Sequence, residues 1–92
     1  MTQQGIQISL AGKAALITGS ARGLGAEIAT ALARAGAAVM ISDILEDQGQ
    51  RTVAAIQAAG GKAAFVRQDV TSEADWSVAV EATVNAFGGF DI

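Results

Sequence analysis

The stretch Thr18-Gly19-Ser20-Ala21-Arg22-Gly23-Leu24-Gly25 decides the fold of this chain. It follows an apolar run at residues 14–17 and leads into residues 26–33, whose apolar positions have helical spacing. A strand, a glycine-rich turn and a helix in this order let the backbone approach a pyrophosphate and direct the N–H groups of the helix toward it. The stretch therefore predicts the opening unit of a dinucleotide-binding fold.

Strand-like runs recur along the chain at residues 13–18, 38–43 and 62–68, and a fourth begins near Phe90. A period of roughly 25 residues suits one strand and one helix per unit, with parallel strands and right-handed crossovers. We expect an α/β fold: the N-terminal half of a Rossmann-type doubly wound parallel sheet, βαβαβα followed by the start of a fourth strand. Residues 1–92 would then be the N-terminal part of a single NAD(P)-binding domain, cut off before its catalytic segment.

The apolar spacing also predicts one buried face for each helix. The expected faces are Leu24, Ile28 and Leu32 for the first, Val53 and Ile56 for the second, and Trp76, Val80, Val84 and Phe87 for the third. Glycines at 36, 60–61 and 88–89 mark the expected helix ends, and Ser72 with Asp75 resembles a capping box.

The composition is that of a globular protein, with 51% hydrophobic residues, 16% charged residues and a formal net charge of −3. Because no basic cluster occurs, we expect no nucleic-acid partner, and no apolar stretch reaches the ~18 residues that cross a membrane. The chain has no cysteine and no histidine, so we expect no disulfide and no metal site. Residues 1–10 do not resemble a signal peptide, which makes a cytoplasmic protein the expectation.

The glycines of the loop have separate expected roles. Gly19 lets the chain turn sharply off the strand, Gly23 removes a side chain where a cofactor approaches, and Gly25 lets the helix pack closely. A tight turn that binds no ligand is the alternative. Ser20 either donates to a phosphate or caps the helix, and Arg22 either contacts a phosphate or stays solvated.

Acidic residues follow the second and third strands. Asp43 lies 18 residues after Gly25, where a carboxylate can accept hydrogen bonds from an adenosine ribose. An N-cap of the next helix is a compatible alternative. Asp69 and Val70 are candidates for contacting the adenine amino group and ring, with a simple turn as the alternative. Trp76 is expected in the core or in an interface.

Together these residues resemble the N-terminal part of a classical short-chain dehydrogenase/reductase. Residues 10–19 resemble the first strand of that family, and residues 18–25 resemble its Thr-Gly-x-x-x-Gly-x-Gly loop. Residues 69–71 resemble its adenine-site Asp-Val-Thr, and residues 89–92 resemble the approach to its fourth strand. The resemblance covers nearly the whole chain.

The resemblance implies an NAD-dependent oxidoreductase that transfers a hydride between a nicotinamide cofactor and a small alcohol or ketone, in a protein that forms dimers or tetramers. The implied cofactor-binding residues are Gly19, Ser20, Arg22, Gly23, Leu24, Gly25, Asp43, Ile44, Asp69 and Val70. Asp43 marks the NAD-preferring branch, whereas an arginine at the place of Arg22 occurs in some NADP-binding members. NAD is therefore the expected cofactor, and NADP is the second choice.

No position of this chain can take the family's catalytic Ser, Tyr and Lys roles. The chain contains no tyrosine, and its lysines, Lys13 and Lys62, lie at the starts of strands. The resemblance therefore carries over the cofactor site alone, with no catalytic residue and no metal ligand assigned. The alternative is a free-standing dinucleotide-binding or regulatory module that does not catalyse.

Overall fold

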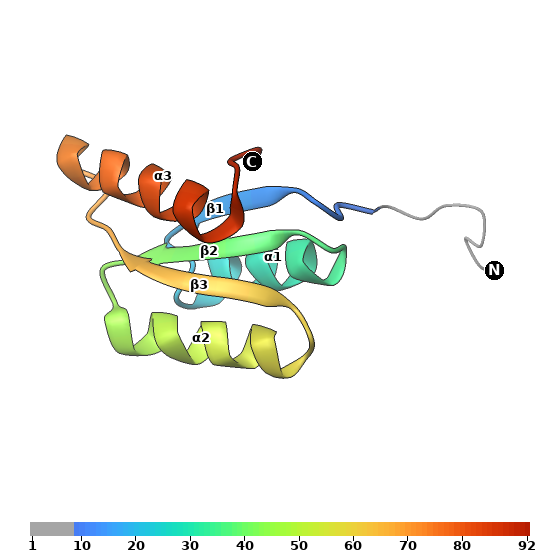
Figure 1. Ribbon diagram of the computed structural model, residues 1–92. Helices are drawn as coiled ribbons and strands as arrows, with labels where there is room; N and C mark the ends of the chain where they lie inside the picture. The colour runs from blue at the N-terminus through green and yellow to red at the C-terminus, as the bar shows by residue number, and fades with distance from the viewer. Residues whose placement is uncertain (1–8) are drawn as a thin grey trace.

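The computed structural model describes residues 9–92, which form a three-stranded sheet covered by helices on both faces (Figure 1). In chain order the elements are β1 (Ala14–Thr18), α1 (Gly23–Arg34), β2 (Ala38–Asp43), α2 (Glu46–Ala58), β3 (Lys62–Arg67) and α3 (Glu73–Phe87). The predicted βαβαβα order is confirmed.

The strands are parallel and lie in the order β1-β2-β3. Their starts are in register, because Ala14 pairs with Ala38 and Ala38 pairs with Lys62. Parallel strands need a crossover back to the starting edge, and each crossover here contains one helix. The carboxyl ends of all three strands consequently lie at one edge of the sheet.

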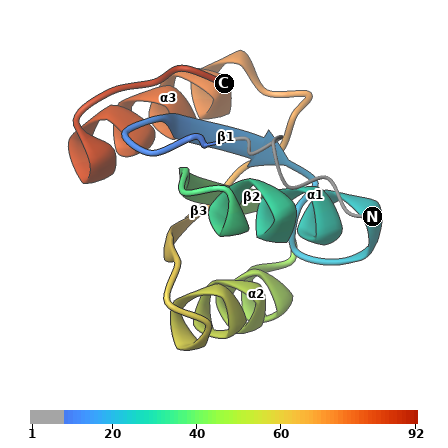
Figure 2. The same ribbon diagram turned by 90° about the vertical axis from the view of Figure 1, so that its right-hand side faces the viewer.

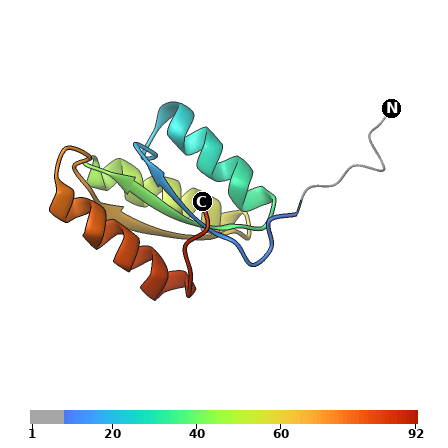
Figure 3. The same ribbon diagram turned by 90° about the horizontal axis from the view of Figure 1, so that it is seen from above.

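Helices α1 and α2 cover one face of the sheet, and α3 covers the other (Figures 2 and 3). The face under α1 and α2 holds a compact core of small and branched side chains: Ala15, Ala29, Ala37, Val39, Ile41, Val53, Ile56 and Ala63. The prediction that Val53 and Ile56 are buried is confirmed. Within the described residues, no helix is long and apolar enough to cross a membrane.

The predicted buried faces of α1 and α3 are wrong in part. On α1, Leu24 and Ile28 are 72% and 45% exposed, while Ala29 is fully buried. On α3, Ala79 and Thr83 are fully buried, while Trp76 and Val84 are more than 40% exposed. Small side chains face the sheet because they let a helix approach it closely. Among the larger predicted residues, Leu32 does pack against the core.

The end of the described chain runs along the open edge of β1. The Ile92 N–H donates to the Ala14 carbonyl at 3.1 Å, and the Leu16 N–H donates to the Ile92 carbonyl at 2.9 Å. Bonds to the two residues that flank Ala15 are the pattern of a parallel ladder. The predicted start of a fourth strand therefore lies beside β1, on the side away from β2.

Asp91 adds a side-chain bond at the same edge, because its Oδ2 accepts from the Ala14 N–H at 2.9 Å. Ala14 is 3% exposed, so loss of this acceptor leaves a buried donor unsatisfied. We predict that Asp91→Ala lowers the free energy of unfolding of the complete protein by about 1–3 kcal/mol. Asp91→Asn retains an acceptor oxygen and should lose less than half of that in urea denaturation. An equal loss in both variants would contradict the assignment.

Candidate dinucleotide site

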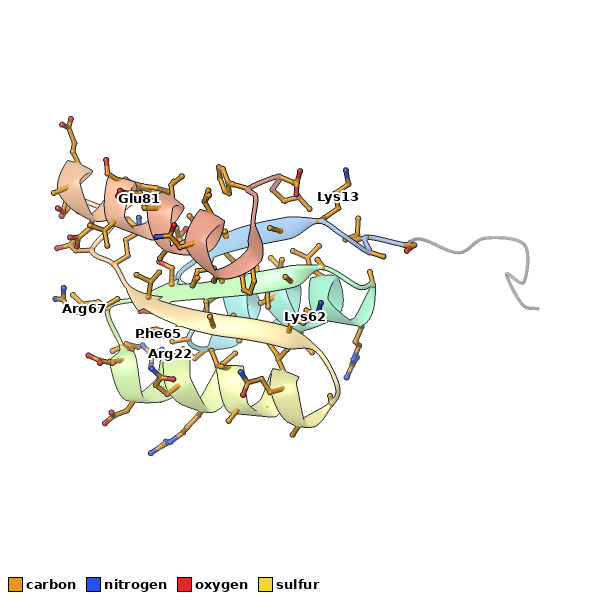
Figure 4. The ribbon with its side chains drawn as sticks, in the orientation of Figure 1. Lys13, Arg22, Lys62, Phe65, Arg67 and Glu81 are labelled. Atoms are coloured by element: carbon orange, nitrogen blue, oxygen red, sulfur yellow. The ribbon has the colours of Figure 1, made fainter. Side chains whose placement is uncertain are left out.

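The predicted site residues lie at the carboxyl ends of the three strands, on the loops that follow them and on the first turn of α1. Figure 4 shows Arg22 and Arg67 at this end of the sheet, with Lys13 and Lys62 at the opposite end. The loop after β1 contacts the end of β2 directly, since the Ser20 N–H donates to the Ser42 carbonyl at 3.1 Å. The edge therefore brings sequence-distant residues into one surface.

Asp43, the last residue of β2, holds two backbone segments at once. Its Oδ2 accepts from the Ala21 N–H and its Oδ1 accepts from the Leu45 N–H, both at 3.1 Å. The N-cap of α2 is Leu45, so Asp43 is not the cap. Each carboxylate oxygen has a second lone pair. The half-buried Asp43 side chain can therefore accept further hydrogen bonds from a ligand.

The Ser20 side chain is directed into the protein. Its hydroxyl donates to the Ile17 carbonyl at 2.6 Å and accepts from the Ser42 N–H at 3.1 Å, and the residue is fully buried. It does not cap α1, whose N-cap is Arg22. In this position Ser20 fixes the turn after β1, and its contact with a phosphate stays a prediction.

A buried polar chain continues from this turn across the sheet. The Ser42 hydroxyl hydrogen-bonds the Gln68 Oε1, while the Gln68 Nε2 has no partner among the described residues. The Gln68 N–H donates to the Asp43 carbonyl at 3.1 Å, which extends the connection to the loop after β3. These bonds join the ends of β1, β2 and β3 beneath the surface of the candidate site.

Helix α2 also fixes the glycine loop, through a residue that sequence reasoning did not single out. The Thr52 hydroxyl donates to the Ala21 carbonyl at 2.6 Å. Together with Asp43, this contact satisfies both polar groups of the Ala21 backbone. A polar residue on a helix face gives no local signal of such a contact. The sequence gives a weak indication of the structural role of Ser42, because it is a polar residue within an apolar strand.

The N-terminus of α1 is suited to an anion. Its N-cap, Arg22, makes no side-chain capping bond, and its first turn contains no acidic residue. The first turns of α2 and α3 each contain two acidic residues. The backbone N–H groups at the start of a helix carry partial positive charge. Of the helices in residues 9–92, α1 is therefore the one whose start favours a phosphate.

The glycines of the loop leave its backbone accessible. Gly19 and Gly23 have φ values of +64° and +62°, which favour glycine, and a Cβ at either position would meet open space. Gly25 differs, because a Cβ there would overlap the Gly19 carbonyl and lie 2.9 Å from the Ser20 Cα. Gly25 therefore lets the start of α1 pack directly against the backbone of the loop, which specifies where the predicted close packing of this helix occurs.

The loop after β3 presents Asp69 and Val70. The Asp69 Oδ1 accepts from the Thr71 N–H at 2.9 Å and from the Thr71 hydroxyl at 2.6 Å. The hydroxyl and backbone bonds from Thr71 lower the pKa of Asp69, so this carboxyl stays ionised at neutral pH. The turn that was the alternative reading is present, and the Asp69 Oδ2 accepts no hydrogen bond from the described residues.

Apolar side chains flank these acidic groups. Ile44 is 53% exposed after β2, and Val70 is 51% exposed after β3. A hollow of about 310 Å³ beside Asp43 is lined by residues 44–48. Exposed aliphatic groups next to hydrogen-bond acceptors are suited to a flat ring with polar edges.

No group of three or more potential metal-ligating side chains occurs within residues 9–92.

Comparison with known proteins places this chain in a family. The model of the short chain dehydrogenase family matches residues 13–92, so the chain belongs to that family. It is 55% identical over 80 residues to the 2,5-dichloro-2,5-cyclohexadiene-1,4-diol dehydrogenase of Sphingobium indicum, covering 87% of this chain and 32% of that protein. It is 42% identical over 85 residues to the 7alpha-hydroxysteroid dehydrogenase of Escherichia coli, covering 92% and 33%.

Solved structures agree with the sequence comparison. A crystal structure of hydroxysteroid dehydrogenase from Escherichia coli superposes with a TM-score of 0.89 at 43% sequence identity, covering 91% of this chain and 36% of that one. A dehydrogenase/reductase from Sinorhizobium meliloti gives a TM-score of 0.88 at 43% identity, covering 92% and 34%. The chain spans about a third of the length of the curated relatives that it matches.

The contact between Gly25 and the loop gives a direct test of the site's architecture. We predict that Gly25→Ala lowers the free energy of unfolding by about 1–3 kcal/mol, because backbone atoms must move to accept the methyl group. Gly89→Ala is the matched control, since a Cβ at Gly89 meets no atom within 4 Å. Chemical denaturation of the complete protein measures both. Equal stability of the two variants would show that the contact with Gly19 is not tight.

Proposed function

We propose that the complete protein is an NAD-dependent oxidoreductase that transfers a hydride between the nicotinamide and an alcohol or ketone. In this proposal the residues described above bind the adenosine and pyrophosphate half of the cofactor. The observation that carries the proposal is the junction of Ala21 and Asp43, which joins an open helix N-terminus to a carboxylate at one edge of a parallel sheet. Membership of the short chain dehydrogenase family supports it.

The pyrophosphate would lie against the start of α1. The open backbone at Gly19 and Gly23 gives it room, and the N–H groups of the first turn are suited to its oxygens. The exposed Arg22 side chain adds a positive charge at the same place. Leu24, which is largely exposed in the first turn, would pack against the cofactor and lose water contact on binding.

The adenosine would extend across the ends of β2 and β3. Asp43 would accept from the ribose hydroxyls with the lone pairs that its two backbone bonds leave available. The adenine ring would lie between the exposed Ile44 and Val70 side chains. Its amino group would donate to the Asp69 Oδ2. The pyrophosphate and the adenosine together would then use the ends of all three strands.

The nicotinamide supplies hydride transfer when the cofactor is bound. The described residues contribute binding and orientation, and we assign no proton-transfer group among them. The names of the relatives, a diol dehydrogenase and hydroxysteroid dehydrogenases, support an alcohol as the substrate. A complete protein that turns over such alcohols would exclude a non-catalytic binding module.

Cofactor preference tests the role of Asp43. We predict that the complete protein binds NADH at least tenfold more tightly than NADPH, because a 2′-phosphate would face the Asp43 carboxylate and lose a charge-assisted hydrogen bond worth about 1.5–3 kcal/mol. Asp43→Asn removes the charge at constant size and should bring the two dissociation constants closer in calorimetric titration. Equal or tighter binding of NADPH by the unsubstituted protein would overturn the preference.

Turnover separates an enzyme from a binding module. We predict that the complete protein reduces NAD in the presence of a hydroxysteroid or a cyclic diol, followed by the absorbance of NADH. A panel that contains both alcohol classes and a primary alcohol gives the first view of specificity. Tight NADH binding without turnover of any panel member would favour the non-catalytic module.

A further inference from the structure

The loop after β3 is held by side chains from the first turn of α3. The Asp75 Oδ2 accepts from the Asp69 N–H at 2.9 Å, and the Trp76 Nε1 donates to the Val70 carbonyl at 2.8 Å. The Ser72 hydroxyl caps the helix by accepting from the Asp75 N–H at 3.2 Å. Helices α1 and α2 have no side-chain capping bond. Side-chain hydrogen bonds therefore join the loop after β3 to the helix that follows it, which is not so for the loops after β1 and β2.

We infer that Asp75 and Trp76 are positioning residues that make this protein select adenine over a base with a carbonyl in place of the adenine amino group. The inference rests on the proposed function, since it takes Asp69 and Val70 as the adenine contacts. Asp75 and Trp76 do not touch the base themselves. They fix the two consecutive residues that do.

The first step of the argument concerns the backbone. One bond holds the N–H of Asp69 and the other holds the carbonyl of Val70, so both ends of this two-residue segment are fixed by α3. A segment fixed before a ligand arrives does not lose conformational entropy when the ligand binds. The geometry of the free Asp69 oxygen is then set by α3 rather than by the base.

The second step concerns the Asp69 carboxylate. Thr71 occupies the Oδ1 with two hydrogen bonds, which orients the group and leaves the Oδ2 as the acceptor for a ligand. Because these bonds also lower the pKa of Asp69, the group is an acceptor and not a donor at neutral pH. A base with an amino group can donate to it. A base with a carbonyl there presents a second acceptor and is repelled.

The third step concerns whether Asp75 and Trp76 act on the loop or on the core. Trp76 is 41% exposed, so its ring is only partly used as core, and its N–H is directed to the loop. Asp75 likewise directs a carboxylate oxygen at a peptide N–H of the loop. Both polar groups act on residues 69–70. An effect confined to that segment should change base selection more than it changes stability.

The test compares two cofactors that differ at one group. NADH carries adenine. Reduced nicotinamide hypoxanthine dinucleotide carries hypoxanthine, which has a carbonyl where adenine has its amino group. Dissociation constants of both are measured by calorimetry on the complete protein and on Trp76→Phe, Asp75→Ala and Asp75→Asn. Asn keeps an acceptor oxygen without the charge, which separates the hydrogen bond from electrostatics. Val78→Ala, at an exposed residue of the same helix, is the control.

We expect Trp76→Phe and Asp75→Ala to bind NADH about fivefold more weakly, as for loss of one hydrogen bond, with binding of the hypoxanthine cofactor unchanged. Asp75→Asn and Val78→Ala should keep the selectivity of the unsubstituted protein. Equal weakening of both cofactors, or unchanged selectivity in Trp76→Phe and Asp75→Ala, would overturn the inference. NADH binding without selectivity in the unsubstituted protein would overturn it while leaving the proposed function intact, whereas absence of NADH binding would overturn both.

Discussion

Parallel pairing of three strands is the constraint on which the other features of this molecule depend. In a parallel sheet every strand points the same way, so every connection after a strand starts from the same edge. Residues far apart in the chain, such as Gly23, Asp43 and Asp69, are collected there without any long-range signal in the sequence. The edge is polar because strand ends and the loops after them leave backbone groups to be satisfied. Here the side chains of Ser20, Asp43 and Asp75 satisfy three of them.

The close approach of α1 is the second constraint. The absence of a side chain at Gly25 brings the helix against the loop backbone, and one turn later Ala29 is fully buried in the core. The small Ala29 is the fully buried residue of this helix, and Leu32 packs against the core further along it. Leu24 and Ile28, in contrast, are exposed on the outer side of the helix.

The element order, the parallel topology and the start of a fourth strand were predictable from the sequence, because they follow from local punctuation and period. The positions of the glycine loop after β1 and of Asp43 at the end of β2 were predictable for the same reason. The inward faces of α1 and α3 were not, since ranking apolar residues by size ignores the distance between helix and sheet. Ala29, Ala79 and Thr83 are fully buried, although none of them is a large apolar residue.

The supporting contacts of the site were outside the reach of sequence reasoning. Thr52 and Trp76 each bond a backbone carbonyl in another segment, and such contacts have no periodic or compositional signature. Ser20 was identified, yet the direction of its hydroxyl could not be, because an inward rotamer depends on the position of Ser42 in the neighbouring strand.

The dual use of Asp43 has a consequence for protein engineering and for evolutionary change of cofactor. The carboxylate that we propose to recognise the ribose also accepts a hydrogen bond from the Ala21 N–H. A substitution that replaces this carboxylate to accommodate a 2′-phosphate can therefore remove a hydrogen bond that holds the glycine loop. A single substitution that changes the preference and leaves no acceptor at position 43 therefore also reduces the order of the loop. An evolved or engineered variant with such a substitution needs a second substitution that supplies a new acceptor for the Ala21 N–H.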